Sequence, residues 1–415
     1  TLTNTLTAAS VRGHQGNLSD VHTVMATAKH FIGDGATEYG VEGGVTTLSE
    51  NEIEEHLLPP YRTAVASGVG AVMASFNIYE GIPMHAHKRM ITDVLKEQMQ
   101  FDGIMLSDWK GYSKFGEADI INAGIDMVMA VDGDLELFQK GLKKAVEEGH
   151  VSRERIDDAV RRILRQKFRL GLFENPYSVD TFIDSIGSQE HRDVARQAVR
   201  ESLVLLKNEK NLLPLTPGVG KIVVVGAHAN NAGLQSGGWT IDWQGTDRNY
   251  TGATTILEGI QMNSNAEVVY DPDGTGEHTD ADVAIICVGE PPYAEFFGDI
   301  GHESNSLKLE LSTEQKGYLE HYDKQGVPTV VVLLSGRPLV TTKEIKQASA
   351  FIAAWLPGSE GDGIAEVLFG KYNFKGRLPH SWPASLDDFK GKYGPNHWEG
   401  SVEPLFPLGY GLSYP

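Results

Sequence analysis

The stretch Phe101-Asp102-Gly103-Ile104-Met105-Leu106-Ser107-Asp108-Trp109 decides the fold of the first half of the chain. Ile104, Met105 and Leu106 form an uninterrupted apolar run, which is typical of a strand buried on both faces of a parallel sheet. The run ends in a hydroxyl, a carboxylate and a large aromatic side chain. Because the carboxyl ends of the strands carry the chemistry in an α/β barrel, Asp108 is a catalytic candidate. The alternative is that Asp108 caps the helix that follows.

Around this stretch, strand-like runs alternate with amphipathic helical ones, an order that predicts a parallel sheet and favours a barrel. The expected strands are residues 24–31, 71–77, 103–108 and 126–130, and the expected helices are residues 50–67, 88–99 and 152–169. About four βα units precede residue 175, whereas a closed barrel contains eight. Half a barrel would have two open apolar edges. We therefore expect a missing N-terminal barrel segment, either of the same polypeptide or of a second chain.

The second half of the chain predicts another α/β domain. Apolar runs that each close on glycine lie at residues 221–226, 281–289, 328–336 and 351–358, and a helix at residues 191–207 precedes them. Such runs fit an open, mainly parallel, flavodoxin-like sheet, whose ligands approach the carboxyl ends of the strands. The fold class is thus the C-terminal part of a TIM-like (β/α)8 barrel over residues 1–175, a linker over 176–190, and an α/β sandwich over 191–415.

Composition excludes several classes of function. The formal charge of −20 argues against nucleic acid, whose phosphates would be repelled, and favours a neutral ligand. No apolar stretch has the length of a membrane span. The single cysteine, Cys287, has no internal disulfide partner. His56, His85 and His87 are spaced too loosely for a zinc site, and we expect neither a metal ion nor another cofactor.

Six motifs follow one another along the chain, at residues 29–35 (KHFIGDG), 49–61, 75–83, 102–109, 123–127 and 406–414 (FPLGYGLSY). In this order they resemble glycoside hydrolase family 3, the two-domain β-glucosidases and exo-β-glucanases, over nearly the whole chain. The family's first barrel segment supplies a carboxylate and an arginine that hold the outer sugar hydroxyls, and no residue here stands in for them. The Asp-x-His pair of the family's acetylglucosaminidases is absent from residues 37–44, which favours a glucosidase or glucanase.

The resemblance implies a retaining mechanism with Asp108 as the nucleophile. In such enzymes one carboxylate forms a covalent glycosyl-enzyme, and a second carboxyl group, about 5–5.5 Å away, acts as acid and then as base. By its place in the segment Gly-Glu-x-Pro-Tyr-x-Glu, Glu295 is similar to the family's acid/base residue. Glu290, on the same loop, competes for that role and is otherwise expected to contact substrate.

The resemblance also implies substrate-binding residues. Lys29 and His30 are expected to hydrogen-bond sugar hydroxyls, although a surface lysine and a packed histidine are the alternative. Trp109 and Trp239 resemble two aromatic walls that stack on the apolar face of a sugar; the alternative for Trp239 is an ordinary buried tryptophan. Two further positions are expected to line the site. Phe76 can only pack, and Lys114 replaces an arginine that helps to position the nucleophile in related enzymes.

These observations predict a retaining, exo-acting β-glucoside hydrolase that releases glucose from the non-reducing ends of β-glucosides or β-glucans. A β-xylosidase of the same family and a non-catalytic carbohydrate-binding fragment are the alternatives. The expected partners are the oligosaccharide substrate and the missing barrel segment, and the expected compartment is the periplasm or the extracellular space.

Overall fold

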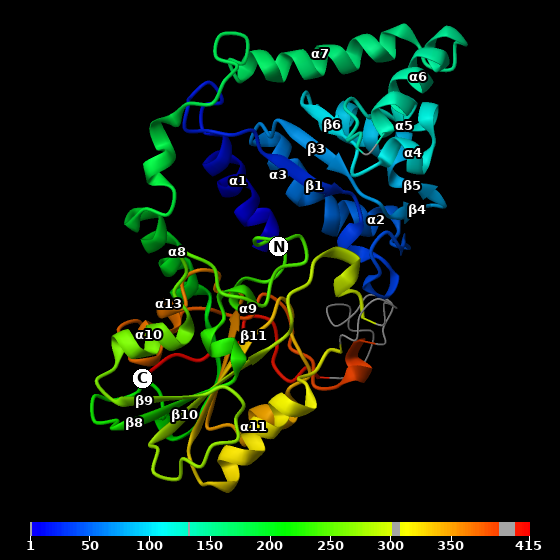
Figure 1. Cartoon of the computed structure of the whole chain (residues 1–415). Helices are drawn as coiled ribbons and strands as arrows, with labels where there is room; N and C mark the ends of the chain where they lie inside the picture. The colour runs from blue at the N-terminus through cyan, green and yellow to red at the C-terminus, as the bar shows by residue number, and fades with distance from the viewer. Residues whose placement is uncertain (1, 132, 301–307, 390–402) are drawn as a thin grey trace. The chain divides into compact units, whose positions relative to one another are not determined.

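The computed structural model describes residues 2–131, 133–300, 308–389 and 403–415. It divides into two compact units, Thr1–Asp180 and Thr181–Pro415, which are drawn from blue to green and from green to red in Figure 1. Each unit combines helices with its own sheets. None of the helices within the described residues combines the length and the hydropathy of a membrane span.

The first unit is built on a parallel sheet of three strands in the order β1-β3-β6 (Figure 1). The strands are β1 (Thr27–Phe31), β3 (Ala71–Ala74) and β6 (Ile104–Leu106). The central strand β3 is buried along its whole length, as expected for an apolar run that is covered on both faces. β1 alternates exposed and partly buried residues until Phe31. Three of the four expected strands are therefore confirmed, each shorter than predicted.

The fourth expected strand, residues 126–130, is wrong: only Met127 makes an isolated parallel bridge, with Leu106. The backbone bonds at this bridge, from the N–H of Asp126 to Met105 and from the N–H of Ser107 to Met127, are supplemented by side-chain bonds. The Asp126 carboxylate accepts from the backbone N–H of Met105 at 2.9 Å, and the hydroxyl of Ser107 accepts from the N–H of Met129 at 2.9 Å. The segment is tied to the end of β6 through these bonds instead of continuing the sheet.

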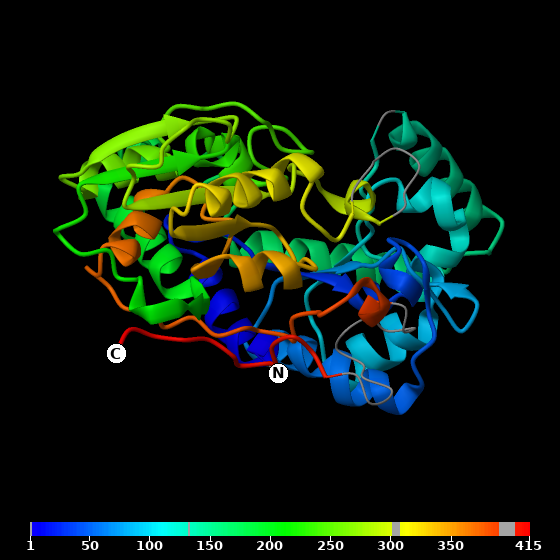
Figure 2. The ribbon, with the colours of Figure 1, turned by 90° about the horizontal axis from the view of Figure 1, so that it is seen from below.

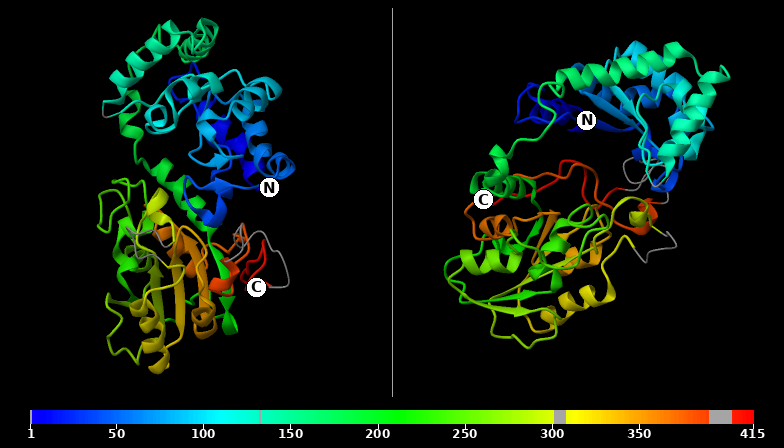
Figure 3. Two further views of the ribbon diagram at one scale, coloured as in Figure 1. Left: turned by 90° about the vertical axis from the view of Figure 1, so that its right-hand side faces the viewer. Right: turned by 45° about the horizontal axis from the view of Figure 1, so that its top comes forward.

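Helices surround this sheet. They are α1 (Leu2–Gln15), α2 (Glu50–Glu52), α3 (Leu58–Ala66), α4 (Gly111–Phe115), α5 (Glu117–Ala123), α6 (Asp134–Glu147) and α7 (Arg153–Arg169), with π-helical turns at Ile53–Leu57 and Arg89–Gln98. The long helix α7 runs beside the strands (Figure 3). As predicted, it begins after Ser152, whose hydroxyl accepts from the N–H of Arg155 and so satisfies a free donor of the first turn.

A second, small sheet of the first unit has the order β2-β4-β5, from β2 (Val45–Thr46), β4 (Ile78–Tyr79) and β5 (Ile82–Pro83). Its hairpin turns at Glu80 and Gly81, with φ angles of 52° and 76°. Two positive φ angles are typical of the tight turns that match the twist of paired strands.

The second unit contains a six-stranded sheet in the order β7-β12-β11-β10-β8-β9. The strands are β7 (Val204–Asn208), β8 (Lys221–Val225), β9 (Glu267–Asp271), β10 (Val283–Gly289), β11 (Thr329–Leu334) and β12 (Ala350–Trp355). All neighbours are parallel except β7 and β12. The expected mainly parallel sheet is therefore observed.

Helices cover both faces of this sheet (Figure 2). One apolar core includes residues of α8 (Gln189–Ser202), α10 (Ile256–Asn263) and α13 (Asp362–Leu368). The other core includes residues of α11 (Thr313–Lys324) and α12 (Thr342–Gln347). The loops after the carboxyl ends of β8 and β10 carry the short helix α9 (Ala232–Ser236) and the 3-10 turn η9 (Glu295–Gly298).

The helix expected at residues 191–207 ends earlier than predicted, at Ser202, and the residues after it form β7. The cause is the apolar run Leu203–Leu206. Leu205 enters one core of the sheet, whereas Val204 and Leu206 enter the other. Burial on both faces is what a strand provides and a surface helix does not. Strand β9, which the sequence did not predict, forms the opposite edge of the sheet.

Candidate functional site

Asp108 lies two residues after the end of β6, in the first unit, and its carboxylate is 16% exposed. Oδ1 accepts from the N–H of Trp109 at 2.6 Å, and Oδ2 lies 3.5 Å from Nε2 of His30. The N-cap of the following helix α4 is Lys110, so Asp108 does not cap that helix. A half-buried carboxylate at the end of a parallel strand is thus available to a ligand.

His30, on β1, lies between two carboxylates. Its Nδ1 is 3.2 Å from Oδ2 of Asp34, and its Nε2 faces Asp108. The neighbouring Lys29 is exposed. The structure therefore brings His30 and Asp108 together, with Lys29 adjacent to His30 in the chain.

His85 is a residue of this site that the sequence analysis missed. It is fully buried, its Nδ1 is 2.9 Å from the carbonyl oxygen of Ser75, and its Nε2 accepts from the N–H of Asp108 at 2.9 Å. Burial lowers the pKa of His85 from 6.5 to about 4, which agrees with one ring nitrogen donating and the other accepting. The neutral ring fixes the backbone of Asp108. Its signal in the sequence was the motif at residues 75–83, which His85 follows by two residues.

An aromatic layer lies next to His85. The ring of Phe76 stacks on it with centroids 5.5 Å apart, and Phe115 stacks on it at 4.8 Å. The ammonium of Lys114 lies 4.0 Å from the centroid of Phe76, a cation–π contact. Trp109 is 52% exposed. Phe76 and Lys114 are therefore in contact with each other, and the Trp109 ring has a solvent-facing surface.

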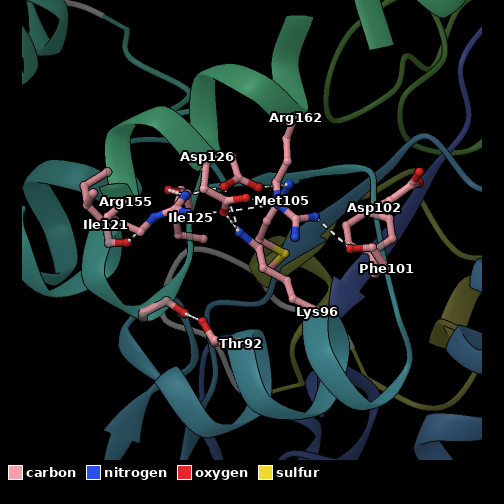
Figure 4. Close-up of polar contacts among 12 residues, drawn as sticks. Thr92, Lys96, Phe101, Asp102, Met105, Ile121, Ile125, Asp126, Arg155 and Arg162 are labelled. Carbon is pink, nitrogen blue, oxygen red and sulfur yellow. Dashed lines mark hydrogen bonds and ion pairs between the residues drawn. The ribbon is translucent and has the colours of Figure 1, made fainter. Parts of the chain in front are cut away.

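A buried network of ion pairs and hydrogen bonds contacts the backbone of β6 and of the residues before it (Figure 4). Asp126, which accepts from the N–H of Met105, pairs with Lys96 at 2.7 Å and with Arg155. Arg162 of α7 donates to the carbonyl oxygen of Phe101 at 2.7 Å. The middle of β6 and the residues that precede it are thus tied to α7 and to the π-helical segment Arg89–Gln98.

In the second unit, Glu290 directly follows β10 and is buried. Its Oε1 accepts a hydrogen bond from Nε of Arg337 at 2.9 Å and lies 2.8 Å from Nη2 of the same side chain. Its Oε2 accepts a hydrogen bond from the hydroxyl of Tyr293 at 3.0 Å. The carbonyl oxygen of Glu290 lies 3.2 Å from Nε2 of His228. Both carboxylate oxygens are therefore occupied by partners within the unit.

Glu295 lies five residues farther along, at the start of η9, and is exposed. Its φ angle is 54°, a left-handed conformation that costs a residue other than glycine about 1–2 kcal/mol. Such strain persists where neighbouring contacts over-determine the backbone, as at many functional sites. The two glutamates of this loop thus have opposite environments: Glu290 is buried and paired, whereas Glu295 faces solvent.

Trp239 is 69% exposed, so the alternative of an ordinary buried tryptophan is wrong. The N–H of Trp239 donates to the carbonyl oxygen of Trp243 at 2.9 Å, and their rings are 6.3 Å apart. Trp243 in turn packs edge-on against Phe296 and Phe297 at 5.8 and 5.6 Å. The Trp239 loop and the Glu295 loop therefore form one aromatic cluster, in which the Trp239 face remains open.

The residues described by the structure include no group of three or more His, Cys, Asp or Glu side chains arranged to hold a metal ion. The first unit offers a carboxylate, two histidines, a lysine and an exposed indole, and the second unit offers glutamates and another exposed indole. This set suits general acid–base and nucleophilic catalysis on a neutral, hydroxyl-rich ligand.

Comparison with known proteins gives two family matches. Residues 1–166 match the glycosyl hydrolase family 3 N-terminal domain, and residues 203–414 match the family's C-terminal domain. Curated relatives include a lysosomal beta glucosidase of Dictyostelium discoideum, 32% identical over 98% of this chain, and a periplasmic beta-glucosidase of Salmonella typhimurium, 31% identical over all of it. The chain spans 54% and 61% of the lengths of these two relatives.

Solved structures agree. An exo-1,3/1,4-beta-glucanase of a Pseudoalteromonas species is 38% identical with a TM-score of 0.90, and the match covers 99% of this chain and 69% of that one. A beta-glucosidase of Listeria innocua in complex with isofagomine is 29% identical with a TM-score of 0.84, over 99% and 62% of the two chains. From the two domain matches and this likeness, the chain belongs to glycosyl hydrolase family 3.

Proposed function

We propose that this chain carries the catalytic residues of a retaining, exo-acting β-glucoside hydrolase that releases glucose from the non-reducing ends of β-glucosides or β-glucans. The observation that carries the proposal is Asp108, a half-buried carboxylate at the end of a buried parallel strand. A histidine lies against its Oδ2, and a second, neutral histidine fixes its backbone. The names of the relatives support the substrate class.

In the proposed mechanism Asp108 is the nucleophile. Its carboxylate attacks the anomeric carbon and forms a glycosyl ester, while the bond to the leaving oxygen breaks and Glu295 donates the proton to that oxygen. Glu295 then takes a proton from water, the water oxygen displaces Asp108, and both carboxyl groups return to their starting states. Glu295 is preferred to Glu290 because the Arg337 and Tyr293 contacts already occupy both oxygens of Glu290.

The remaining residues bind the sugar in this proposal. Lys29 and His30 donate to hydroxyl groups. Trp109 and Trp239 offer exposed indole faces on which the apolar C–H face of a sugar stacks. Phe76 and Lys114 support the aromatic layer next to Asp108. Glu290 stabilises its own loop through its contacts with Arg337 and Tyr293.

We also propose that residues 1–175 are the C-terminal portion of a (β/α)8 barrel, joined through 176–190 to an α/β sandwich over 191–415. The exposure of apolar side chains in the first unit supports this idea, since a further barrel segment would cover them. These exposed side chains include Leu2, Leu6, Val21, Val24 and Phe168. The family matches add no support for a separate partner chain, so that part stays a prediction. Relatives described as periplasmic, from Salmonella typhimurium and Dickeya chrysanthemi, support a periplasmic or extracellular location.

The first prediction concerns Asp108. Asp108→Ala lowers kcat on an aryl β-glucoside by roughly 10³-fold or more, because it removes the attacking group. Wild-type protein treated with a 2-deoxy-2-fluoro-β-glucosyl fluoride gains the mass of one sugar, and peptide mass mapping locates this sugar on Asp108. Asp119→Ala, which removes an exposed carboxylate of the same unit, serves as the control and keeps both properties. Full activity of Asp108→Ala would sink the proposal.

The same assay separates the alternatives. A relative from Formosa agariphila that is 29% identical over the whole chain is described as a beta-xylosidase. Faster hydrolysis of an aryl β-xyloside than of the matching β-glucoside would move the assignment to that activity. Binding of a glucan oligosaccharide without turnover, unchanged by Glu295→Gln, would instead identify a carbohydrate-binding fragment.

A further inference from the structure

The side chain of Arg337, in the loop after β11, closes the loop that carries Glu295. Arg337 forms an ion pair with the carboxylate of Glu290 at the start of the loop, with Nε and Nη2 at 2.9 and 2.8 Å from Oε1. Its remaining terminal nitrogen, Nη1, donates to the carbonyl oxygen of Gly298 at 2.7 Å. One guanidinium therefore joins the first residue of the loop to the last residue of the turn η9, and Glu295 lies between the two attachment points.

Tyr293 fills the interior of this closed loop. Its ring lies 4.5 Å from the guanidinium carbon of Arg337, and its hydroxyl donates to Glu290. A Cβ at Gly298 would come within 2.6 Å of the Tyr293 ring, and a Cβ at Gly238 would come within 2.2 Å of its carbonyl oxygen. No Cβ can come this close to another atom, so only glycine fits at positions 298 and 238. Tyr293 is therefore packed tightly against the backbone of both glycines.

A planar guanidinium suits this task. Its donors point in fixed directions, so it can hold a carboxylate and a carbonyl at once, whereas a lysine ammonium is a single point of charge. Its charge also compensates the buried carboxylate of Glu290, which would otherwise be costly to bury. The exposed Glu295, with its left-handed backbone, is thus carried by a loop whose two ends are fixed.

We propose that Arg337 is the positioning residue for the acid/base loop: by joining Glu290 to Gly298 it fixes where the Glu295 carboxyl group stands. This inference rests on the proposed acid/base role of Glu295. Arg337 acts through the loop and does not touch substrate. Proton transfer is sensitive to such placement, because a shift of about 1 Å in a catalytic group can cost on the order of 10²-fold in rate.

The test uses two β-glucosides that differ in their leaving group. A 2,4-dinitrophenyl glucoside departs without an acid, whereas a methyl glucoside needs one. Arg337→Lys keeps a positive charge near Glu290 but gives up the bond to Gly298. We expect kcat/KM to fall about tenfold or more for the methyl glucoside and less than about threefold for the dinitrophenyl glucoside. Glu295→Gln is measured beside it, with an expected loss of roughly 10²–10⁴-fold on the methyl glucoside alone.

Arg200→Lys is the matched control. Arg200 also pairs with a glutamate, Glu366 at 2.6 Å, and lies 3.9 Å from a tyrosine ring, that of Tyr372. It belongs to α8 and is not part of the Glu290–Gly298 contacts. If the effect were a general loss of stability, Arg200→Lys and Arg337→Lys would behave alike. We expect the ratio of kcat/KM on the two glucosides to change only in Arg337→Lys.

A second measurement does not depend on turnover. Amide hydrogen exchange of the peptide covering residues 290–299 is expected to be faster in Arg337→Lys than in the wild type, and unchanged in Arg200→Lys. Unchanged exchange, or equal losses of kcat/KM on both glucosides, would overturn the inference. If Glu295→Gln itself affects both glucosides equally, the acid/base assignment fails, and the exchange data still decide whether Arg337 holds the loop.

Discussion

At the scale of single residues, His85 has the most sharply defined chemistry. Its two ring nitrogens connect the carbonyl of Ser75 to the N–H of Asp108, and the N–H of Asp108 requires the neutral ring because it needs Nε2 as an acceptor. Burial is the main cause of its low pKa, and the electrostatic effects of Lys114 and His30 act in the same direction. A protonated His85 would lose the bond to Asp108, since it would have no acceptor left.

The second prediction follows from the sign of this shift. The pKa of His85 is about 4 when folded and about 6.5 when unfolded, so the unfolded state binds more protons between these values. The contribution of His85 to stability is complete above pH 6.5 and decreases as the pH falls toward 4. Between pH 7 and pH 5 this amounts to about 2 kcal/mol.

His85→Phe tests this prediction, because it retains a ring for the stack but does not titrate. At pH 7 we expect the variant to be destabilised by about 1–3 kcal/mol, the cost of the unsatisfied partners. In urea unfolding at pH 5, its deficit relative to the wild type should shrink by about 2 kcal/mol. Phe76→Leu, in the same stack, is the control and should keep a constant deficit at the two pH values. A constant deficit for His85→Phe would contradict the prediction.

Several site residues were accessible from the sequence and others were not. Asp108 was predicted as a catalytic residue because a carboxylate ends an apolar run, and this role stays a prediction. The structure shows only that the Trp239 ring is exposed. His85 and Arg337 were missed because their importance lies in what their side chains reach: a backbone N–H 23 residues away for His85, and a carboxylate 47 residues away for Arg337. Such contacts have no local sequence pattern.

At the scale of elements, β6 depends on a helix and a turn that are distant from it in the chain. Asp126 lies between two cations, Lys96 and Arg155, and accepts a bond from Met105 of the strand. Burial lowers the pKa of Lys96 to about 8. Asp126 is the fully buried partner that the two cations share, and the partly exposed Asp158 is a second partner of both. The strand that leads to Asp108 therefore has an electrostatic anchor in addition to its ladder.

The third prediction is that removing this anchor is costly. Asp126→Ala removes the fully buried partner of Lys96 and Arg155 and leaves them the partly exposed Asp158. We expect a loss of about 3–5 kcal/mol from the free energy of unfolding of the first unit. Lys96→Met is the matched variant, because it removes one cation and leaves the pair of Asp126 with Arg155 intact. Lys96→Met should lower the free energy of unfolding clearly less than Asp126→Ala does. Equal losses in urea denaturation would show that the charges are not what stabilises the strand.

Element boundaries illustrate the limit of sequence patterns. Helix α7 and its Ser152 cap were predicted because periodicity and cap agree. The segment at residues 126–130 was not a strand, because its polar groups bond to β6 instead of extending the sheet. The run at residues 203–206 was assigned to a helix, because an apolar run next to a helix shows no boundary until both faces of the sheet are known.

At the scale of the whole molecule, the two units differ in how well their sheets are covered. The six strands of the second unit have an apolar core on each face. The first unit has a three-stranded sheet, and its strand β1 is partly exposed. Proteins with separate cores unfold in separate cooperative steps. We therefore expect the first unit to unfold before the second.

The fourth prediction tests this order with one matched pair of substitutions. Ile91 and Ile352 are both fully buried, the first in the first unit and the second in β12. Each change to alanine should cost about 2–5 kcal/mol. In calorimetry, Ile91→Ala should lower only the first transition and Ile352→Ala only the second, with hydrogen exchange identifying which unit opens. A single transition that moves with either substitution would contradict two independent units.

The pairing of β7 with β12 has a consequence for biosynthesis. β7 lies first in the chain among the strands of its sheet, yet its partner β12 is about 140 residues farther along. A ribosome adds about 5–20 residues per second, so the apolar run 203–206 stays without its neighbour for roughly 7–30 s. During that interval it is an open strand of the kind that aggregates or binds chaperones. Slower decoding between residues 208 and 350 would lengthen this exposure and lower the yield of folded protein without changing a single amino acid.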